Sequence, residues 1–323
     1  MISFSPDLAD AATREGQLRA GGTDLQERRR MTQHTGTPNV LPAIVDLRDV
    51  TESRTIEAGS GSLKVGALVT VAALADDEEV RAGYPGLAQA AAGLATPQIR
   101  AVATVGGNLL QHTRCWYYRT PEGECFKKGG SSCSARKGDH LWHACFDRGP
   151  CVSVHASTLG MALLAYDARI DVIGATMKTV AELYGDGSDA ARHNMLPEAA
   201  VLRGIELDAP KPGERSVYLR VTSRARAEWP LVETLVRIGV EADKIAWAKV
   251  AVGAVAPVPL RLEHVEAALV GAPARPEAVA AIAARAREGT APLPMTGYKV
   301  GLLEGLVADA LERALVAEPV GGA

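Results

Sequence analysis

The sequence predicts an α+β protein, because strand and helix patterns are mixed without the regular alternation of a doubly wound sheet. Short segments that alternate apolar and polar residues predict strands, and Ala- and Leu-rich segments predict amphipathic helices. A stretch rich in proline, glycine and charge at 208–215 separates two patterned regions. Such a stretch is typical of a linker, so we expect one domain at 1–209 and a smaller one at 214–320.

The first domain begins with a short predicted strand, QLRAGG at 17–22, which runs into a glycine turn. Thr23 is the expected N-cap of the helix that follows. A strand is expected next at 43–47, followed by two strands at 55–59 and 63–68 that a Gly/Ser turn joins. Two helices should follow, one at 71–80 capped by Thr70 and an Ala-rich one opened by Pro85. Residues 157–174 should hold two strands and a helix.

The second domain reads as strands followed by helices. Alternating patterns predict strands at 216–224 and 244–255. Apolar residues at helical spacing predict amphipathic helices at 263–271, 277–288 and 302–315. Segregated strands and helices of this kind are typical of a small α+β domain.

Composition excludes several classes of protein. The net charge of −3 argues against a nucleic-acid binder. No apolar run reaches the roughly 20 residues of a membrane helix, and the first residues, MISFSPDLADAATREGQ, lack the basic and apolar regions of a signal peptide. We therefore expect a cytoplasmic protein, which would be periplasmic only if a partner subunit exported it.

Two paired glycines are the first candidate binding motif. AGGTDL at 20–25 and ATVGGNL at 103–109 each place Gly-Gly between a predicted strand and a helix start. Glycine permits a positive φ and close approach of a ligand to the backbone. Successive N–H groups beside a helix N-terminus attract anions. Two such loops could hold the two phosphates of a dinucleotide, although each alone could equally be a tight turn.

These motifs resemble a known family. AGGTDL followed by TPQIRAVATVGGNL is similar to the FAD-binding medium subunit of the molybdenum hydroxylases, which include xanthine dehydrogenases, carbon monoxide dehydrogenases and aldehyde oxidoreductases. The resemblance continues through KVGALVTVAAL and YLRVTSRA to GYKVGLLEGLVADALERAL, and so covers nearly the whole chain. It implies a vanillyl-alcohol-oxidase-type FAD-binding domain of two subdomains and a small C-terminal α+β domain.

The resemblance also implies which residues bind FAD. The first phosphate loop would be formed by Leu18, Arg19, Ala20, Gly21, Gly22, Thr23, Asp24 and Leu25, and the second by Thr104, Val105, Gly106, Gly107 and Asn108. Leu94 stands where relatives border the flavin or adenine, and Leu202 where their backbone meets the isoalloxazine. Arg220 stands where relatives often have a lysine near the flavin. One position departs from the pattern, because Thr158 replaces an Asp that contacts FAD in relatives. A threonine can still hydrogen-bond a hydroxyl of FAD, but it carries no charge.

All five cysteines lie in one segment, between Cys115 and Cys151. This segment resembles an insertion of the 4-hydroxybenzoyl-CoA reductase and periplasmic aldehyde oxidoreductase medium subunits, which binds a [4Fe–4S] cluster. A cluster needs four converging thiolates. The expected ligands are Cys115, Cys125, Cys133 and Cys151, on an insertion at 112–152 that holds seven Lys/Arg against four acids. That positive excess would offset the charge of the cluster.

Other interpretations of this segment remain open. Zinc also binds four cysteines, or cysteines with His140, His143 or His155, but structural zinc favours close Cys pairs, which the sequence lacks. Disulfides would require an oxidising compartment. Cys145 is expected to be a buried free thiol, since relatives have an aliphatic residue there. An exchange of roles between Cys145 and Cys151 is the nearest alternative.

The predicted function is electron transfer within a molybdenum hydroxylase. Oxidation of an aldehyde, purine or aromatic substrate would occur on a molybdopterin-binding large subunit, and electrons would pass through a [2Fe–2S] small subunit to FAD here. No catalytic residue of this chain's own is expected, because the flavin performs the chemistry. The alternatives are a stand-alone flavin oxidase of the same fold and a zinc-stabilised nucleotide-binding scaffold without redox activity.

Overall fold

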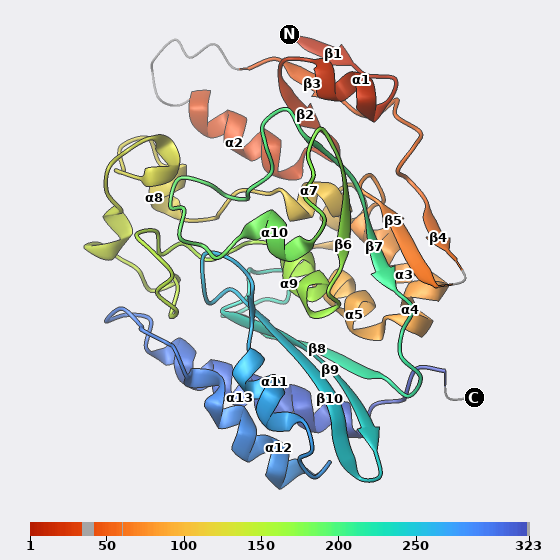
Figure 1. The fold of residues 1–323 in the computed structure, drawn as a ribbon. Coiled ribbons are helices and arrows are strands. Elements are labelled where there is room, and N and C mark those ends of the chain that lie inside the picture. The colour runs from red at the N-terminus through yellow and green to blue at the C-terminus, as the bar shows by residue number, and fades with distance from the viewer. Residues whose placement is uncertain (34–41, 60, 322–323) are drawn as a thin grey trace.

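The computed structural model describes residues 1–33, 42–59 and 61–321. Figure 1 shows a small N-terminal unit at the top, a central unit of strands and helices, and a C-terminal sheet with its helices below. The segment that carries α8 forms a lobe at one side of the central unit. The α+β architecture expected from the sequence is confirmed.

The N-terminal unit is a three-stranded parallel sheet with two helices. The strands lie in the order β1-β3-β2. Their bounds and those of the helices are β1 Ile2–Phe4, α1 Leu8–Thr13, β2 Gln17–Arg19, α2 Thr23–Gln33 and β3 Ile44–Asp46. Leu8, Val45, Leu47 and Leu68 belong to a separate small core. This core holds β2 in place, and directly after β2 the chain leaves the sheet at the first glycine pair.

The central unit is built around an antiparallel sheet in the order β4-β5-β7-β6. Its strands are β4 Ile56–Ala58, β5 Ser62–Gly66, β6 Arg169–Ile173 and β7 Val201–Asp208. The helices are α3 Val71–Asp76, α4 Glu78–Gly83, α5 Pro85–Gly93, α6 Pro97–Arg100, α7 Val105–Leu109, α9 Thr158–Ala165 and α10 Val180–Tyr184. The Gly/Ser turn between β4 and β5 includes position 60, which lies outside the described residues.

The cysteine segment contains little regular structure. It holds the short helices α8 Trp116–Arg119, η1 Phe126–Lys128 and η2 Ser134–Arg136. Cys115, Cys125 and Cys133 each stand directly before one of them. Each of these cysteines is therefore followed by a tight turn of backbone.

The C-terminal unit is an antiparallel sheet in the order β11-β10-β9-β8 with helices on one face (Figure 1). Its strands are β8 Arg215–Val221, β9 Val232–Glu241, β10 Lys244–Gly253 and β11 Leu260–Arg261. Its helices are α11 Glu263–Leu269, α12 Pro276–Ala283, η3 Ala284–Arg287 and α13 Tyr298–Val316. The three amphipathic helices predicted from the sequence are all present.

The central and C-terminal units share one hydrophobic core, in which α5 packs against β8 and β9, and α9 packs against β9 and β10. A buried ion pair lies at this junction. The Arg237 guanidinium donates to both carboxylate oxygens of Glu214, at 2.6 and 2.8 Å, and to the carbonyl oxygen of Ala165.

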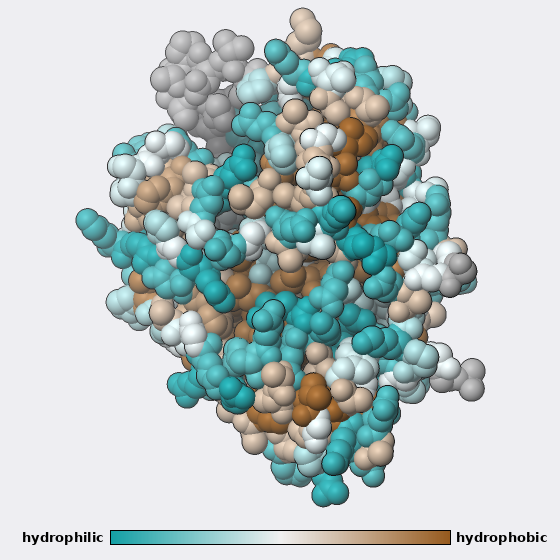
Figure 2. All heavy atoms as spheres, in the orientation of Figure 1, coloured by the Kyte–Doolittle hydropathy of each residue, from teal (hydrophilic) through white to brown (hydrophobic). Residues whose placement is uncertain are grey.

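Figure 2 shows apolar side chains gathered in the middle of the face in view. Within the described residues, no helix is long and apolar enough to cross a membrane.

Several predicted elements differ from the structure. Thr23 is the first residue of α2 rather than its N-cap. The helix predicted at 71–80 is two helices, because the Asp77 side chain accepts the Val80 N–H at 3.0 Å and caps a second helix. Residues 157–174 form one helix and one strand instead of a helix and two strands. The sequence analysis also missed β9, which is buried along most of its length and lacks polar alternation.

Candidate functional site

Two adjoining cavities lie where the N-terminal, central and C-terminal units meet. The first has a volume of about 140 Å³ and is lined by residues 18–25, Gly106 and Leu202. The second has a volume of about 250 Å³ and is lined by Leu94, Asn108 and residues from the loop between β8 and β9. Both share Thr23, Asp24, Gly107 and Gln111, so an elongated ligand could extend from one into the other.

The first glycine pair forms the inner wall of the smaller cavity. A side-chain Cβ at Gly21 would lie 1.8 Å from the carbonyl oxygen of Val102, so this position accepts only glycine. Gly22 has a φ of +72°, which also favours glycine. The N–H groups of Gly21 and Gly22 donate to no other residue that the structure describes. With the unpaired N–H groups of the first turn of α2, they form a nest of donors that suits a phosphate.

The second glycine pair is built differently from the expectation. Gly106 and Gly107 lie inside the short helix α7, and neither has a positive φ. The Thr104 hydroxyl caps this helix by accepting the Gly107 N–H at 3.1 Å. A Cβ at Gly106 would lie 2.9 Å from the Cβ of Ala67. Close packing therefore explains the glycine at position 106. The glycine at position 107 instead leaves space along the wall of the cavity.

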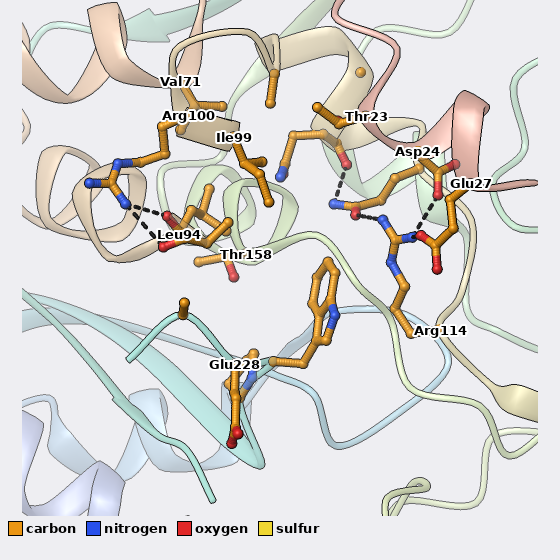
Figure 3. A pocket seen from close by; sticks show the side chains of 18 of the residues that line it. Thr23, Asp24, Glu27, Val71, Leu94, Ile99, Arg100, Arg114, Thr158 and Glu228 are labelled. Carbon is orange, nitrogen blue, oxygen red and sulfur yellow. Dashed lines mark hydrogen bonds and ion pairs between the residues drawn. The ribbon is translucent and has the colours of Figure 1, made fainter. Parts of the chain in front are cut away.

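The larger cavity is closed by side chains from three parts of the chain (Figure 3). The Arg100 guanidinium donates to the carbonyl oxygen of Leu94 at 2.6 Å and to that of Ala95 at 3.1 Å. The Arg220 guanidinium donates to the carbonyl oxygen of Glu228 at 3.0 Å and so holds the β8–β9 loop. Trp229, on that loop, stacks under the Arg114 guanidinium at 4.7 Å from the ring centre.

An arginine cluster around Asp24 ties the first glycine loop to the cysteine segment. The Asp24 carboxylate pairs with Arg28, Arg114 and Arg119, each at 2.9 Å. Burial alone would raise the pKa of Asp24, but Arg114 and Arg28 hold that pKa below its usual range. The carboxylate is thus ionised and connects the start of α2 with residues on both sides of Cys115.

The Thr158 hydroxyl points to a buried carboxyl group. It donates to Glu233 Oε2 at 2.8 Å, and the Tyr218 hydroxyl donates to the same oxygen at 2.9 Å. Thr158 also lines the larger cavity. Thr158 thus contacts an acidic group of β9 that lies one layer behind the wall of the cavity.

Burial raises the pKa of Glu233 above its ordinary value, although Thr158 and Tyr218 oppose this. Above a pH of about 4.5, the carboxyl group of Glu233 loses its proton more readily in the unfolded chain than in the folded chain. Ionisation of Glu233 therefore favours unfolding. Glu233→Gln keeps an acceptor for both hydroxyls without the charge. We expect its Tm to exceed that of wild type at pH 8 by more than about 2 °C, with the difference vanishing near pH 4. Glu312→Gln, at an exposed position of α13, is the matched control; an equal shift in both variants would contradict the prediction.

The cavities contain nearly all of the residues proposed from the sequence for FAD. All of residues 18–25, and also Leu94, Thr104, Gly106, Gly107, Asn108, Thr158, Leu202 and Arg220, line one cavity or the other. Val105 does not, because it is fully buried and its N–H donates to the carbonyl oxygen of Val69. Ile99, Arg100, Gln111 and Trp229 were missed. The TPQIR stretch marked the first two, but no local pattern marked Trp229.

Four of the five cysteines are linked through their effects on pKa. Burial raises the pKa of Cys115 to about 11, with contributions from Cys151 and Cys125, while the N–H groups of Tyr118 and Tyr117 lower it. Burial also raises the pKa of Cys125, as do Cys151 and Cys133. These four thiols therefore share one neighbourhood, although the Cys115 side chain accepts no capping hydrogen bond from α8.

Cys145 lies apart from that neighbourhood. It is fully buried in the main hydrophobic core, where its N–H donates to the carbonyl oxygen of Val255 at 2.9 Å. Burial raises the pKa of its thiol to about 11, and the charged side chain that acts on it is Lys299 rather than another cysteine. Within the described residues, no three His, Cys, Asp or Glu side chains are grouped as a single metal ion would need. A cluster differs, since each of its thiolates binds a separate iron.

The comparisons with known proteins identify the family. Residues 7–206 match the FAD-binding domain of molybdopterin dehydrogenases, and residues 217–314 match the C-terminal domain of the CO dehydrogenase flavoprotein. The chain belongs to the FAD-binding subunits of the molybdopterin dehydrogenases. Such a subunit is an oxidoreductase component of the aldehyde and xanthine dehydrogenase type, which transfers electrons through FAD. The unpartnered N–H groups of the first glycine loop suit the pyrophosphate of this cofactor.

Individual relatives agree with this assignment. The chain is 31% identical over 256 residues to the aldehyde oxidoreductase FAD-binding subunit PaoB of Escherichia coli. This match covers 77% of this chain and 78% of the relative. It is 24% identical over 258 residues to the nicotinate dehydrogenase FAD-subunit of Eubacterium barkeri, covering 79% of this chain and 71% of the relative. Both relatives thus match along most of their length.

A solved structure shows the same fold. A chain of carbon monoxide dehydrogenase from Hydrogenophaga pseudoflava superposes with a TM-score of 0.73 at 22% identity, over 98% of this chain and 96% of that one. The expected FAD-binding domain followed by a small C-terminal domain is therefore confirmed as the fold.

Proposed function

We propose that this chain is the electron-transfer subunit of a three-subunit molybdenum hydroxylase and carries a [4Fe–4S] cluster beside its FAD. A molybdopterin-binding large subunit would oxidise the substrate, an aldehyde, purine or aromatic compound, and a [2Fe–2S] small subunit would deliver the electrons. The observation that carries the proposal is the 31% identity to an aldehyde oxidoreductase FAD-binding subunit. The domains we propose are 1–209 and 214–320, with the insertion at 112–152.

In this proposal the protein binds and orients the flavin. When bound, FAD accepts and releases electrons. The N–H groups of Gly21 and Gly22 would hold its pyrophosphate, and Gly107 would leave room for it. Leu94 and Leu202 would pack against its rings, and Arg220 keeps the β8–β9 loop in place over the larger cavity.

The cluster would be held by Cys115, Cys125, Cys133 and Cys151. The mutual effects of these thiols on their pKa values support a common site. Cys133 and Cys151 also raise the pKa of Arg136, beyond the larger effect of its hydrogen bond to Asp147. Arg136 is one of the cationic groups that would offset the negative charge of an oxidised cluster.

The two alternatives have less support. A zinc-stabilised scaffold would bring its donors to within about 4 Å of one another around one ion, and no such group occurs among the described residues. A stand-alone oxidase needs its own substrate domain, whereas residues 217–314 match the C-terminal domain of the CO dehydrogenase flavoprotein.

Purification of the native protein tests the proposal. We expect it to copurify with two further chains, one containing molybdopterin and one containing [2Fe–2S] iron, and to show a flavin absorption band on a broad iron–sulfur shoulder. Flavin, molybdenum and iron analysis of each separated chain checks this. A single chain that turns over an organic substrate would favour the oxidase instead, and zinc without iron in this chain would rule out the cluster.

A further inference from the structure

A third cavity, of about 280 Å³, lies between the cysteine segment and the C-terminal unit. It is separate from the proposed flavin site but shares part of its wall, because Arg114, Glu228, Trp229 and Pro230 line both. Cys115, a proposed cluster ligand, also lines it, as does His143, whose Nε2 lies 3.2 Å from the Cys115 sulfur, but the proposed function assigns no ligand to the space itself. Its volume is close to the lower end of the range for small-molecule sites.

The walls of this cavity are aromatic. Three of the four tryptophans of the chain, Trp116, Trp142 and Trp229, line it. They come from three places in the sequence: α8, the end of the cysteine segment and the β8–β9 loop. Trp142 and Trp229 remain 41% and 47% exposed, although they are large apolar residues. Several indole side chains around a small space favour an aromatic ligand.

The cavity also contains a buried positive charge. Lys299, at the start of α13, is 1% exposed. Its ammonium group donates to the carbonyl oxygens of Trp142 at 3.2 Å and Ala254 at 2.9 Å. An ammonium has three donors, so one is left over. Among the described residues no carboxylate forms an ion pair with it.

A buried charge is unfavourable unless an opposite charge compensates it. Burial lowers the pKa of Lys299 to about 8, so the group still carries its charge at neutral pH. Glu228, which lines the same cavity, forms its ion pair with Arg224 at 3.3 Å and none with Lys299. An anionic group brought by a ligand would supply such a partner.

We propose that this cavity binds a small planar aromatic carboxylate, with its rings among Trp116, Trp142 and Trp229 and its carboxylate on Lys299. Because Trp229 and Arg114 also border the flavin pocket, the ligand would contact the wall of that pocket from behind. Binding would then alter the surroundings of the flavin. The inference needs the fold and this cavity but not the iron–sulfur cluster.

Calorimetric titration of the full chain, loaded with its flavin, tests the proposal with 2-naphthoate as the probe. We expect saturable binding of one molecule per chain and a small shift of the flavin absorption band. The neutral isostere 2-naphthamide should bind at least tenfold more weakly, since it lacks the charge that Lys299 requires. Equal binding of the two compounds, or no saturable binding, would overturn the proposal.

Variants locate the site. Trp142→Ala removes a wall of this cavity alone and should weaken 2-naphthoate binding at least tenfold, with flavin content unchanged. Lys299→Gln keeps a donor for the two carbonyl groups and should remove the preference for the carboxylate over the amide. Val270→Ala, an exposed apolar position outside the cavity, is the control and should bind as wild type does. If Ile99→Ala, in the flavin pocket, loses binding while Trp142→Ala keeps it, the probe occupies the flavin site and the proposal is wrong.

Discussion

Replacing Gly107 with valine is expected to lower the FAD content of the purified chain at least tenfold while the chain remains folded. Gly107 lines both cavities at the point where they join, so a branched side chain there would occupy the space proposed for the cofactor. Its backbone is helical, which valine can adopt. The nearest atom to a new Cβ is the Thr104 hydroxyl at 3.0 Å, a contact that a small shift relieves.

The measurement is the ratio of flavin to protein after gel filtration, with circular dichroism to check the fold. Gly301→Val is the matched control, because Gly301 is an exposed helical glycine of α13 with no atom within 4 Å of a new Cβ. This control shows how much of any change in flavin content or fold comes simply from placing valine at a helical glycine. A Gly107→Val chain that retains stoichiometric, tightly bound FAD would show that the second glycine motif does not contact the cofactor.

Gly21 and Gly22 give less selective tests of the same site. A Cβ at Gly21 would overlap the carbonyl oxygen of Val102, so any substitution there moves the loop between α6 and α7. Gly22 has space around it, but its φ of +72° strains any other residue. Loss of flavin in either variant could therefore come from a distorted loop, whereas at Gly107 the backbone needs no change.

The first glycine loop illustrates what the sequence can predict. A strand, two glycines and a helix follow one another within a few residues, so their arrangement depends on local rules for turns and helix starts. The same holds for Thr70 and Pro85, which begin α3 and α5 as expected. The amphipathic helices of the C-terminal unit also carry their own signal, because one face of each is apolar.

The rest of the site depends on contacts between distant segments. Glu233 meets Thr158 only because β9 lies against α9, and the strand β9 itself was missed, since burial on both faces removes its alternating pattern. Trp229 reaches the cavities through the β8–β9 loop and its contact with Arg114. The three arginines that surround Asp24 come from α2 and from the cysteine segment. Arg28 stands four residues after Asp24 on α2, a spacing that favours an ion pair, but the other pairings have no local signature.

Substituting the cysteines one at a time by serine is expected to separate ligands from the bystander. Serine replaces a soft thiolate by a hydroxyl that is poorly deprotonated and binds iron weakly. In Cys115→Ser, Cys125→Ser, Cys133→Ser and Cys151→Ser, iron should fall from about four atoms per chain to less than one. Iron analysis and electron paramagnetic resonance of the reduced chain measure this, and the flavin content of each variant reports whether the FAD site has survived.

Cys145→Ser is the matched control from the same segment. Its thiol lies in the main hydrophobic core, and no other cysteine acts on its pKa. A hydroxyl buried there without a partner should lower the free energy of unfolding by about 1–3 kcal/mol but leave all of the iron in place. Loss of iron in Cys145→Ser with full iron in Cys151→Ser would exchange the roles of these two residues. Full iron in all five variants would mean that the iron lies elsewhere in the complex and that this segment carries no cluster.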